Sequence, residues 1–273
     1  MDGKSRYREI YEVNLCGAWR QYRFLWPQLG DIVGIRDKDV IKANLMSYIN
    51  DNNLIGTGRD FQFLSFSDNI KQVYDLYNDT YVWIALSTDI SAKNSYIDNY
   101  FDPWYAVAGQ ARGSINNVVK LGWTSELSQR DAMYPNRINS VIKKKGTGIY
   151  IYGEKNLMSV KSDLGHNHNR KTLNFIEVNL KKYMEQVLWE FNDAITRGNV
   201  VNTIEPFLRN IKAKRGLIDY VLQCDATNNP ATVIEDGTII VAIYLKMAHV
   251  IEKVELQFTI TKASVSFDEV LTK

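Results

Sequence analysis

The chain has 273 residues and a mass of 31.4 kDa, which is enough for one large domain or two ordinary ones. Its hydrophobic fraction of 45% and charged fraction of 23% are close to globular averages, so the composition excludes a wholly disordered chain. Lys and Arg number 33 against 31 Asp and Glu, and this near-neutral balance argues against a dedicated nucleic-acid binder. With only two cysteines, a disulfide scaffold and a thiolate zinc cage are also excluded.

Aromatic residues make up 12% of the chain, and 16 of them are tyrosines. This content indicates large contact surfaces as well as a core. The longest apolar run, residues 239–245, is far shorter than the roughly 20 residues that a membrane-spanning helix needs. The N-terminus is charged and polar, unlike a secretory signal. We therefore expect a soluble chain from a reducing compartment, with neither a membrane nor a nucleic-acid partner.

The first 113 residues predict one helix and two strands. Residues 37–50 place apolar side chains at helical spacing after an acidic start, which predicts an amphipathic helix. A strand-like stretch opens with phenylalanines between residues 61 and 66, and residues 81–86 favour a second strand. Residues 94–113 are rich in Asn, Pro and Gly and are predicted to form turns, so a soft domain boundary is expected near residues 88–100.

The rest of the chain predicts two long helices between strands. The short strands before the helices are expected at 118–123 and 148–153, the helices at 170–189 and 199–214, and the strands after them at 217–224, 238–247 and 250–261. The strand at 238–247 is apolar on both faces, which suits a central position in a sheet. The strand at 250–261 alternates apolar and polar side chains. Because no regular βαβ repeat appears, the fold class is α+β or mixed α/β.

Few residues are suited to catalysis or metal binding. His166 and His168, with Asp163 nearby, form a metal-like cluster, but no further ligand follows at the usual spacing, so a solvated loop is favoured. The glycine pairs at 56–58 and 146–148 lack the context of a dinucleotide site, and no Walker A sequence occurs. The lysine run at 143–145 is expected to be a solvated loop, with a phosphate-contact patch as the minority interpretation. No catalytic, metal or cofactor site is therefore predicted.

Six short motifs occur in order from about residue 101 onward. The longest runs from Cys224 and Asp225 through Thr227, Asn228 and Asn229 to Pro230, and an Ile243-Tyr-Leu-Lys246 strand follows it. The others are Trp104 with Ala108-Gly109 and Arg112-Gly113, Arg130-Asp131 with Ile138-Asn139, the strand from Gly148 to Gly153, the segment from Glu205 to Tyr220, and Phe267-Asp268-Glu269. In order and spacing they resemble the C-terminal half of contractile tail sheath proteins, found in phages and related injection machines.

Several positions depart from the family pattern. Val107 stands where proline is usual, Asn156 replaces a threonine, and Pro230 comes one place early. The usual Arg-Arg pair of the family is replaced by Arg170-Lys171 or by Lys171-Thr172, which weakens the case for the inter-subunit ion pair that the family has there.

The resemblance implies two regions with different roles. Residues 96–273 would form the conserved sheath C-terminal domain, with a central mixed sheet and two long helices. Residues 1–95 match weakly and would be part of a smaller, variable, outward-facing N-terminal region. Family members are longer, so we expect the chain to be a fragment or a shortened homologue.

The resemblance also implies a function. Such a protein is a structural subunit, not an enzyme, that polymerises around a tail tube and contracts to drive the tube through the host envelope. It needs no cofactor. Its partners would be other sheath subunits, the tube protein, and baseplate and neck or terminator proteins. Its place would be the virion tail, assembled in the host cytoplasm.

In this family, arms from adjacent subunits complete a sheet, a form of β-augmentation. The strand at 250–261 and the tail behind it are the expected arm, with an ordinary terminal edge strand as the alternative. The expected contact residues are Val254, Leu256, Phe258, Ile260 and Phe267. Three cations near the end of the second helix, Lys212, Lys214 and Arg215, are expected to meet acidic groups on a neighbour or the tube.

Two other classes of function stay open from the sequence. One is an enzyme domain that binds a nucleotide or metal without a recognisable motif. The other is a binding module, unrelated to phages, that uses the aromatic surface.

Overall fold

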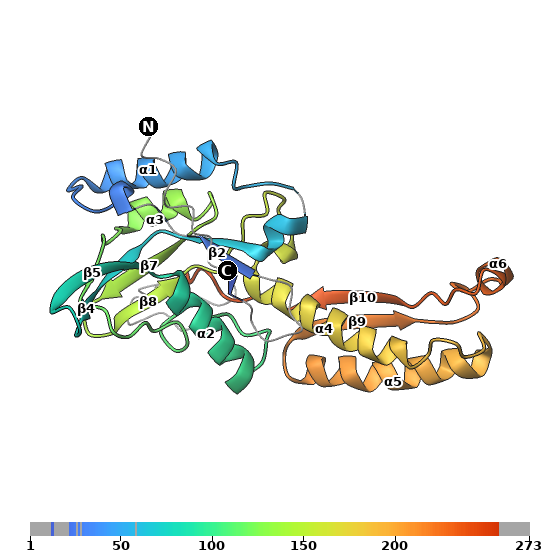
Figure 1. Cartoon of the computed structure of the whole chain (residues 1–273). Coiled ribbons are helices and arrows are strands. Elements are labelled where there is room, and N and C mark those ends of the chain that lie inside the picture. The colour runs from blue at the N-terminus through green and yellow to red at the C-terminus, as the bar shows by residue number, and fades with distance from the viewer. Residues whose placement is uncertain (1–11, 14–21, 26, 28, 58, 257–273) are drawn as a thin grey trace, which may run out of the picture.

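The structure is a computed structural model that describes residues 12–13, 22–25, 27, 29–57 and 59–256. It consists of a body and an arm (Figure 1). The body contains the N-terminal strands and helices, and the arm contains two long helices and a strand pair that extend away from it. The predicted contact residues Phe258, Ile260 and Phe267 lie outside the described residues.

Helices and strands are mixed along the chain, as predicted. The strands are β1 Glu12–Val13, β2 Tyr22–Leu25, β3 Leu64–Ser67, β4 Ile70–Asp75, β5 Thr80–Ala85, β6 Lys120–Leu121, β7 Ile138–Lys144, β8 Gly148–Tyr152, β9 Leu217–Gln223 and β10 Ala242–Met247. The helices are α1 Lys38–Asp51, α2 Ser87–Tyr100, α3 Leu127–Met133, α4 Asn167–Glu185, α5 Ala194–Ala213 and α6 Ala231–Glu235. Short 3-10 turns are Leu29–Asp31, Arg59–Phe63 and Asp163–Gly165.

The strands form three sheets. The largest has the order β1-β2-β3-β7-β8, with parallel pairing of β3 to β2 and β7 and antiparallel pairing at its two ends. A second sheet has the order β5-β4-β6 and is antiparallel. The third is an antiparallel ribbon of β9 and β10 in the arm.

The five-stranded sheet is covered on both faces. On one face Ile41 and Leu45 of α1 pack with Ile138 of β7. On the other face Ile90 of α2 packs with Val141 of the same strand. Ile138 and Val141 are three positions apart, and alternation along a strand sends such side chains to opposite faces. Figure 1 shows α1 and α2 on the two sides of the sheet accordingly.

The first turn of α4 fixes the arm to the body through two buried cations. Arg170 donates to Gln62 at 3.1 Å and lies 4.7 Å from the ring centre of Phe63. Lys171 forms an ion pair with Asp98 of α2 at 2.5 Å. Buried charges are tolerated only when paired, so these contacts fix where α4 leaves the body. The family resemblance associates this position with an ion pair between subunits, whereas these bonds of Arg170 and Lys171 lie within one chain.

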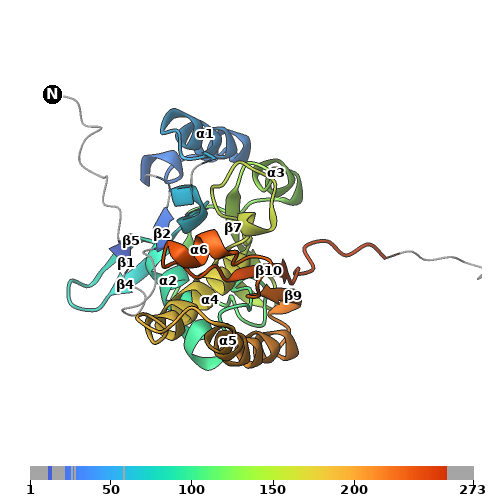
Figure 2. The same cartoon turned by 90° about the vertical axis from the view of Figure 1, so that its right-hand side faces the viewer.

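In the arm, α4 and α5 pack against one face of the ribbon. Ile204, Leu208 and Ile211 of α5 form a core with Leu217 and Met247 of the ribbon. Figure 2, which views the molecule from the tip of the arm, shows α6 in front of this ribbon. The ribbon therefore has one covered face, while its long edges remain open among the described residues.

The sequence predicted the longest elements and missed several shorter ones. The helices α1, α4 and α5 and the strands β5, β8, β9 and β10 are confirmed. Residues 94–100, the first part of the stretch predicted to form turns, instead belong to α2. Small polar side chains such as Ser91 and Asn94 share its buried face with Ile90 and Ile97 and hide the apolar pattern. The elements α3, β4 and β7 were not predicted.

Two strand predictions were wrong in detail. β10 is not central within this chain, because β9 is its only partner among the described residues. Residues 250–256 form no strand in the described part of the chain, since no neighbouring strand is available there for pairing.

The proposed division at residue 95 falls within α2. The largest sheet combines β2 and β3 from before this position with β7 and β8 from after it. The outward-facing role of residues 1–95 stays a prediction, because it concerns an assembly.

Candidate assembly interface

The ribbon of β9 and β10 presents unpaired strand edges. Leu222 lies opposite Ile243 and Val221 opposite Tyr244 in the antiparallel register, and no described strand pairs with either outer edge. Unpaired edges carry free backbone donors and acceptors, which are templates for pairing with another strand. Ile218, Val221 and Tyr244 are also exposed, so apolar surface accompanies these edges.

A groove runs between β9 and α5. Its volume is about 530 Å³, and its walls are formed by four residues from each side: Val201, Glu205, Arg209 and Lys212 of α5, and Asp219, Tyr220, Val221 and Leu222 of β9. The α5 residues recur at every third or fourth position, so they form one stripe along the helix. A strand added at the edge of β9 would lie beside this stripe.

The loop after β9 is closed by side chains of the Cys224–Pro230 motif. Asp225 accepts from the backbone N–H of Thr227 at 2.8 Å, and Asn228 donates to the carbonyl of Gln223 at 2.9 Å. Asn229 is buried, accepts from the N–H of Ile240 at 2.7 Å and donates to its carbonyl at 3.0 Å. These bonds hold the start of β10 against the end of β9, which is a structural role. Burial raises the pKa of the Cys224 thiol, so this cysteine is poorly suited to be a nucleophile.

Residues 248–256 leave the ribbon with their apolar side chains in solvent. Ile251, Val254 and Leu256 are 85%, 72% and 74% exposed. Glu252 holds the segment to the body, because its Oε1 accepts from the Tyr134 hydroxyl at 2.5 Å. The segment therefore combines a polar anchor with an unpaired apolar pattern.

His166 and His168 are not in a solvated loop, and that prediction was wrong. His168 is buried at the start of α4, with Nε2 3.4 Å from the carbonyl oxygen of Ala248. His166 Nδ1 lies 3.2 Å from Glu252, and burial lowers the pKa of this imidazole while Glu252 opposes the shift. The burial of these histidines was not predicted, because it arises where Ala248 and Glu252, which are distant in the sequence, fold back over the start of α4. No group of three or more metal-type side chains occurs among the described residues.

The three cations predicted to contact other subunits differ in whether they already form an ion pair within the chain. Lys212 is paired with Asp219 at 2.7 Å, and Lys214 with Asp102 at 3.3 Å. Arg215 is exposed and forms no ion pair with a described residue. Their role in contacts between subunits stays a prediction.

The remaining family-motif residues stabilise the fold. Trp104 is buried and donates from Nε1 to the carbonyl of Lys214 at 3.0 Å, while Arg112 donates to the carbonyl of Ala106 at 2.8 Å. Gly148 has a φ of +95°, a conformation that favours glycine. A Cβ at Gly153 would lie 2.8 Å from the Cα of Asn139, so the close approach of the two chains needs glycine there.

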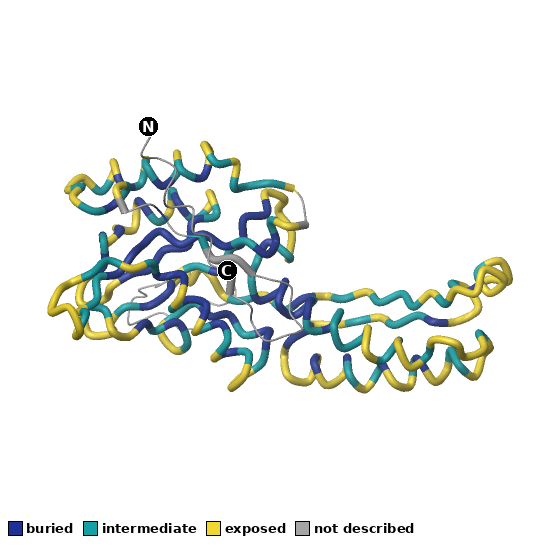
Figure 3. The backbone as a smooth tube through the Cα atoms, viewed as in Figure 1, coloured by how far each residue is buried: buried dark blue, intermediate teal, exposed yellow. Residues whose placement is uncertain are grey.

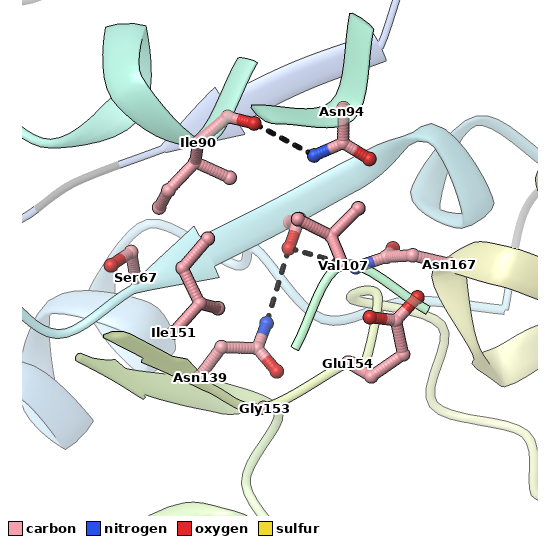
Figure 4. A pocket seen from close by; sticks show the side chains of 10 residues that line it. Ser67, Ile90, Asn94, Val107, Asn139, Ile151, Gly153, Glu154 and Asn167 are labelled. Carbon is pink, nitrogen blue, oxygen red and sulfur yellow. Dashed lines mark hydrogen bonds between the residues drawn. The ribbon is translucent and has the colours of Figure 1, made fainter. Parts of the chain in front are cut away.

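A polar cavity inside the body is too small for a substrate. Its volume is about 20 Å³, and Ser67, Asn94, Asn139 and Glu154 are among its walls (Figure 4). That volume suits one water molecule, whereas small-molecule sites are usually about 300–1,000 Å³.

Among the described residues, no helix is long and apolar enough to cross a membrane.

Sequence comparison identifies the C-terminal part of the chain. The family model described as phage tail sheath C-terminal domain matches residues 159–261, which include α4, α5, the ribbon and the exposed segment. The chain is 33% identical to the tail sheath protein of Enterobacteria phage T4 over 207 residues, which are 76% of this chain and 31% of that protein. The tail sheath protein of Vibrio phage KVP40 is 33% identical over 74% of this chain and 30% of its own length. The chain thus spans about a third of the relatives that it matches.

Solved structures share the fold at lower identity. A chain of the anti-feeding prophage baseplate superposes with a TM-score of 0.66 at 15% identity, covering 82% of this chain and 65% of the other. A chain of the PVC sheath complex, an extracellular contractile injection system in its contracted state, gives 0.65 at 20% identity, covering 72% and 56%. These similarities extend the match from the arm to much of the body.

Proposed function

We propose that this chain, whose residues 159–261 match the phage tail sheath C-terminal domain and which is 33% identical to a phage tail sheath protein over 76% of its length, is a structural subunit of a contractile sheath. In this role it polymerises with other copies around a tail tube and contracts to drive the tube through the host envelope. It does so as a structural protein and not as an enzyme. It forms part of the virion tail after assembly in the host cytoplasm.

The open ribbon is the observation that carries the proposal. It lies in the matched domain, its edges are unpaired among the described residues, and the 530 Å³ groove runs along β9. An added strand would gain backbone hydrogen bonds from the edge and apolar contact in the groove. It would also make β10 or β9 a central strand, which suits the apolar sequence of residues 239–245.

The exposed segment is the proposed donor strand. Val254 and Leu256 point apolar side chains into solvent at alternate positions, and the chain continues beyond Leu256. Because this segment pairs with no strand in the described part of its own chain, it can pair with the ribbon of a second copy. Such a link joins two rigid bodies through a flexible connection, so it can persist while the bodies rotate.

The other proposed partners follow from the family. The baseplate, the tube and the neck or terminator proteins would contact the sheath at its ends and inner surface. Arg215, which has no ion pair in the described residues, is the best candidate among the three cations for an acidic group on the tube or a neighbour. The proposed outer position of residues 1–95 belongs to the same hypothesis.

Paired substitutions in the donor strand test the proposal. Val254→Asp with Leu256→Asp should leave the thermal midpoint of the subunit within about 2 °C, because both side chains are exposed, and abolish polymers in electron micrographs. Glu255→Thr, at the exposed polar position between them, is the matched control and should polymerise normally. Unchanged polymers from the double variant would refute this segment as the donor.

A further inference from the structure

The tip of the arm exposes large apolar side chains that the ribbon does not use. We define the arm tip as residues 185–197, between α4 and α5, and residues 231–240, around α6. The two parts touch, because Asn192 donates to the carbonyl of Thr238 at 2.8 Å. Trp189 is 102% exposed, Phe191 86% and Ile195 73%, and Figure 3 shows mostly exposed residues, with some of intermediate burial, at this end of the molecule. Contiguous exposed apolar groups of this size are typical of protein contact sites.

Trp189 stands out because packing does not explain it. Its φ is +75°, in the left-handed region where a bulky side chain is unfavourable and glycine is usual after a helix. A tryptophan at this position is strained and fully solvated. Strained residues that contribute nothing to the core are concentrated at functional sites, and tryptophan is enriched in binding hot spots.

Beside Trp189, a groove between α4 and α5 offers a place for a partner side chain. Its volume is about 230 Å³, and Met184, Val187, Val200 and Ile204 supply its apolar walls. Glu190 stands at its rim. The groove can thus take an apolar side chain that lies next to a basic one.

The charge of the arm tip favours a basic partner. It carries five carboxylates, Glu185, Glu190, Asp193, Glu235 and Asp236, against one cation, Arg197, for a net charge of −4. The whole chain carries +2, so the rest of the chain carries +6. Glu190, Glu235 and Asp236 make no side-chain hydrogen bond or ion pair with a described residue. An acidic, apolar surface is complementary to a basic one, and the rest of this chain is basic, so a second copy of the chain can supply the matching surface.

The matching surface lies at the other end of the molecule. Lys143 and Lys144 at the end of β7 and Lys145 in the turn that leads to β8 are exposed, and none of the three forms an ion pair with a described residue. Leu76 and Tyr77, 81% and 99% exposed, form the tip of the β4–β5 hairpin at the same side of the body (Figure 1). Figure 1 shows the arm tip at the opposite end, so one molecule cannot bring its own two surfaces together.

We propose that the arm tip of one subunit docks on the Lys143–Lys145 turn and the β4–β5 hairpin of a second copy. The contact is head-to-tail, so repetition generates rings or helical filaments instead of closed dimers. It deepens the proposed function and rests on it, because it is a contact between sheath subunits additional to strand exchange. Trp189 and Phe191 supply the apolar anchors, and Glu190 and its neighbours face the lysines.

Zero-length cross-linking of the full chain tests this contact. Polymers from equal amounts of ¹⁴N- and ¹⁵N-labelled chains are treated with a carbodiimide, which joins carboxylates to lysine amines, and the peptides are analysed by mass spectrometry. We expect mixed-label cross-links from Glu190, Glu235 or Asp236 to Lys143–Lys145. Polymers without these cross-links would overturn the contact and leave the proposed function standing. Cross-links from the tip that join only peptides of the same label would place the contact within one chain and overturn the second copy as occupant, and a chain that forms no polymer would overturn both proposals.

Substitutions give an independent readout. Glu190→Lys should lower polymer yield at least tenfold, and Lys144→Glu in the same chain should restore it. Trp189→Ala should do the same as Glu190→Lys, whereas Tyr100→Ala, at an exposed tyrosine of α2, should not. Each variant is checked for an unchanged circular-dichroism melting midpoint. Folded Glu190→Lys and Trp189→Ala variants that polymerise normally would contradict the proposal.

Discussion

At the scale of single residues, the body contains a buried carboxyl whose charge conflicts with its surroundings. Asp68 is fully buried, and its Oδ1 accepts from the N–H of Val141 at 2.8 Å while Oδ2 has no described hydrogen-bond partner. Burial raises the pKa of this carboxyl to about 7, with Arg130 and the hydrogen bonds opposing the shift. A raised pKa means that the folded state binds the proton more tightly than the unfolded state.

Asp68 therefore makes stability depend on pH. Between the ordinary carboxyl pKa near 4 and about 7, the folded state holds the extra proton, so stability falls as pH rises through this window. We expect urea unfolding at pH 5 and pH 8 to show a loss on the order of 2 kcal/mol. Asp68→Asn should remove this loss, because the amide keeps the acceptor and carries no charge. Asp131→Asn, at an exposed position, should retain it, and a pH-independent wild type would contradict the prediction.

Gly198, near the start of α5, and Gly216, just after its end, are expected to respond in opposite ways to substitution by alanine. A Cβ at Gly216 would lie 2.7 Å from Ile211 and 2.8 Å from the Trp104 ring, whereas a Cβ at Gly198, inside the helix, meets nothing within 4 Å. Gly216→Ala should therefore lower the free energy of unfolding by about 2 kcal/mol through overpacking. Gly198→Ala should raise it by about 1 kcal/mol through helix propensity. Denaturant melts measure both, and equal effects would show that Gly216 is not in tight contact.

At the scale of elements, the connection from the ribbon to residues 248–256 sets where the proposed donor strand begins. Glu252 contacts the body at Tyr134 and His166, while the apolar side chains on either side of it remain exposed. The anchor fixes the origin of the segment without using the groups that would pair with another subunit. The segment is thus held to the body and still free to pair.

Loss of the anchor should loosen this segment alone. A hydrogen bond to a carboxylate contributes about 1.5–3 kcal/mol. Glu252→Ala removes this acceptor, so the backbone order parameters of residues 250–254, measured by ¹⁵N relaxation, should fall toward those of a flexible chain. Glu255→Ala, whose side chain contacts only Lys253 among the described residues, is the control and should leave them unchanged. Equal order parameters in the two variants would refute an anchoring role for Glu252.

Sequence reasoning predicted elements with a strong apolar period and failed where polar residues are buried. The stripe of Ile41, Leu45 and Ile49 predicted α1, and all three are buried. In α2 the buried face includes Ser91 and Asn94, so local text rich in turn residues hid a helix. The donor strand was predicted from the alternation at 250–261 together with the family resemblance. The groove beside β9 and the Glu252 anchor depend on contacts between distant segments, which no local pattern reports.

At the scale of the whole molecule, two kinds of surface remain free for other copies. The ribbon edges offer backbone pairing, and the two ends of the molecule offer apolar and charged patches. The near-neutral total charge is the sum of an acidic arm tip and a basic remainder, so it favours attraction between unlike ends of identical subunits.

The most direct test of this account is a cryo-EM map of the polymer formed by the full-length protein. The account predicts an extra strand from another copy paired with the outer edge of β9 or β10, with the side chains of Val254 and Leu256 against the neighbouring arm. A polymer in which both edges of the ribbon stay unpaired, or one in which residues 250–256 contact only their own subunit, would contradict it.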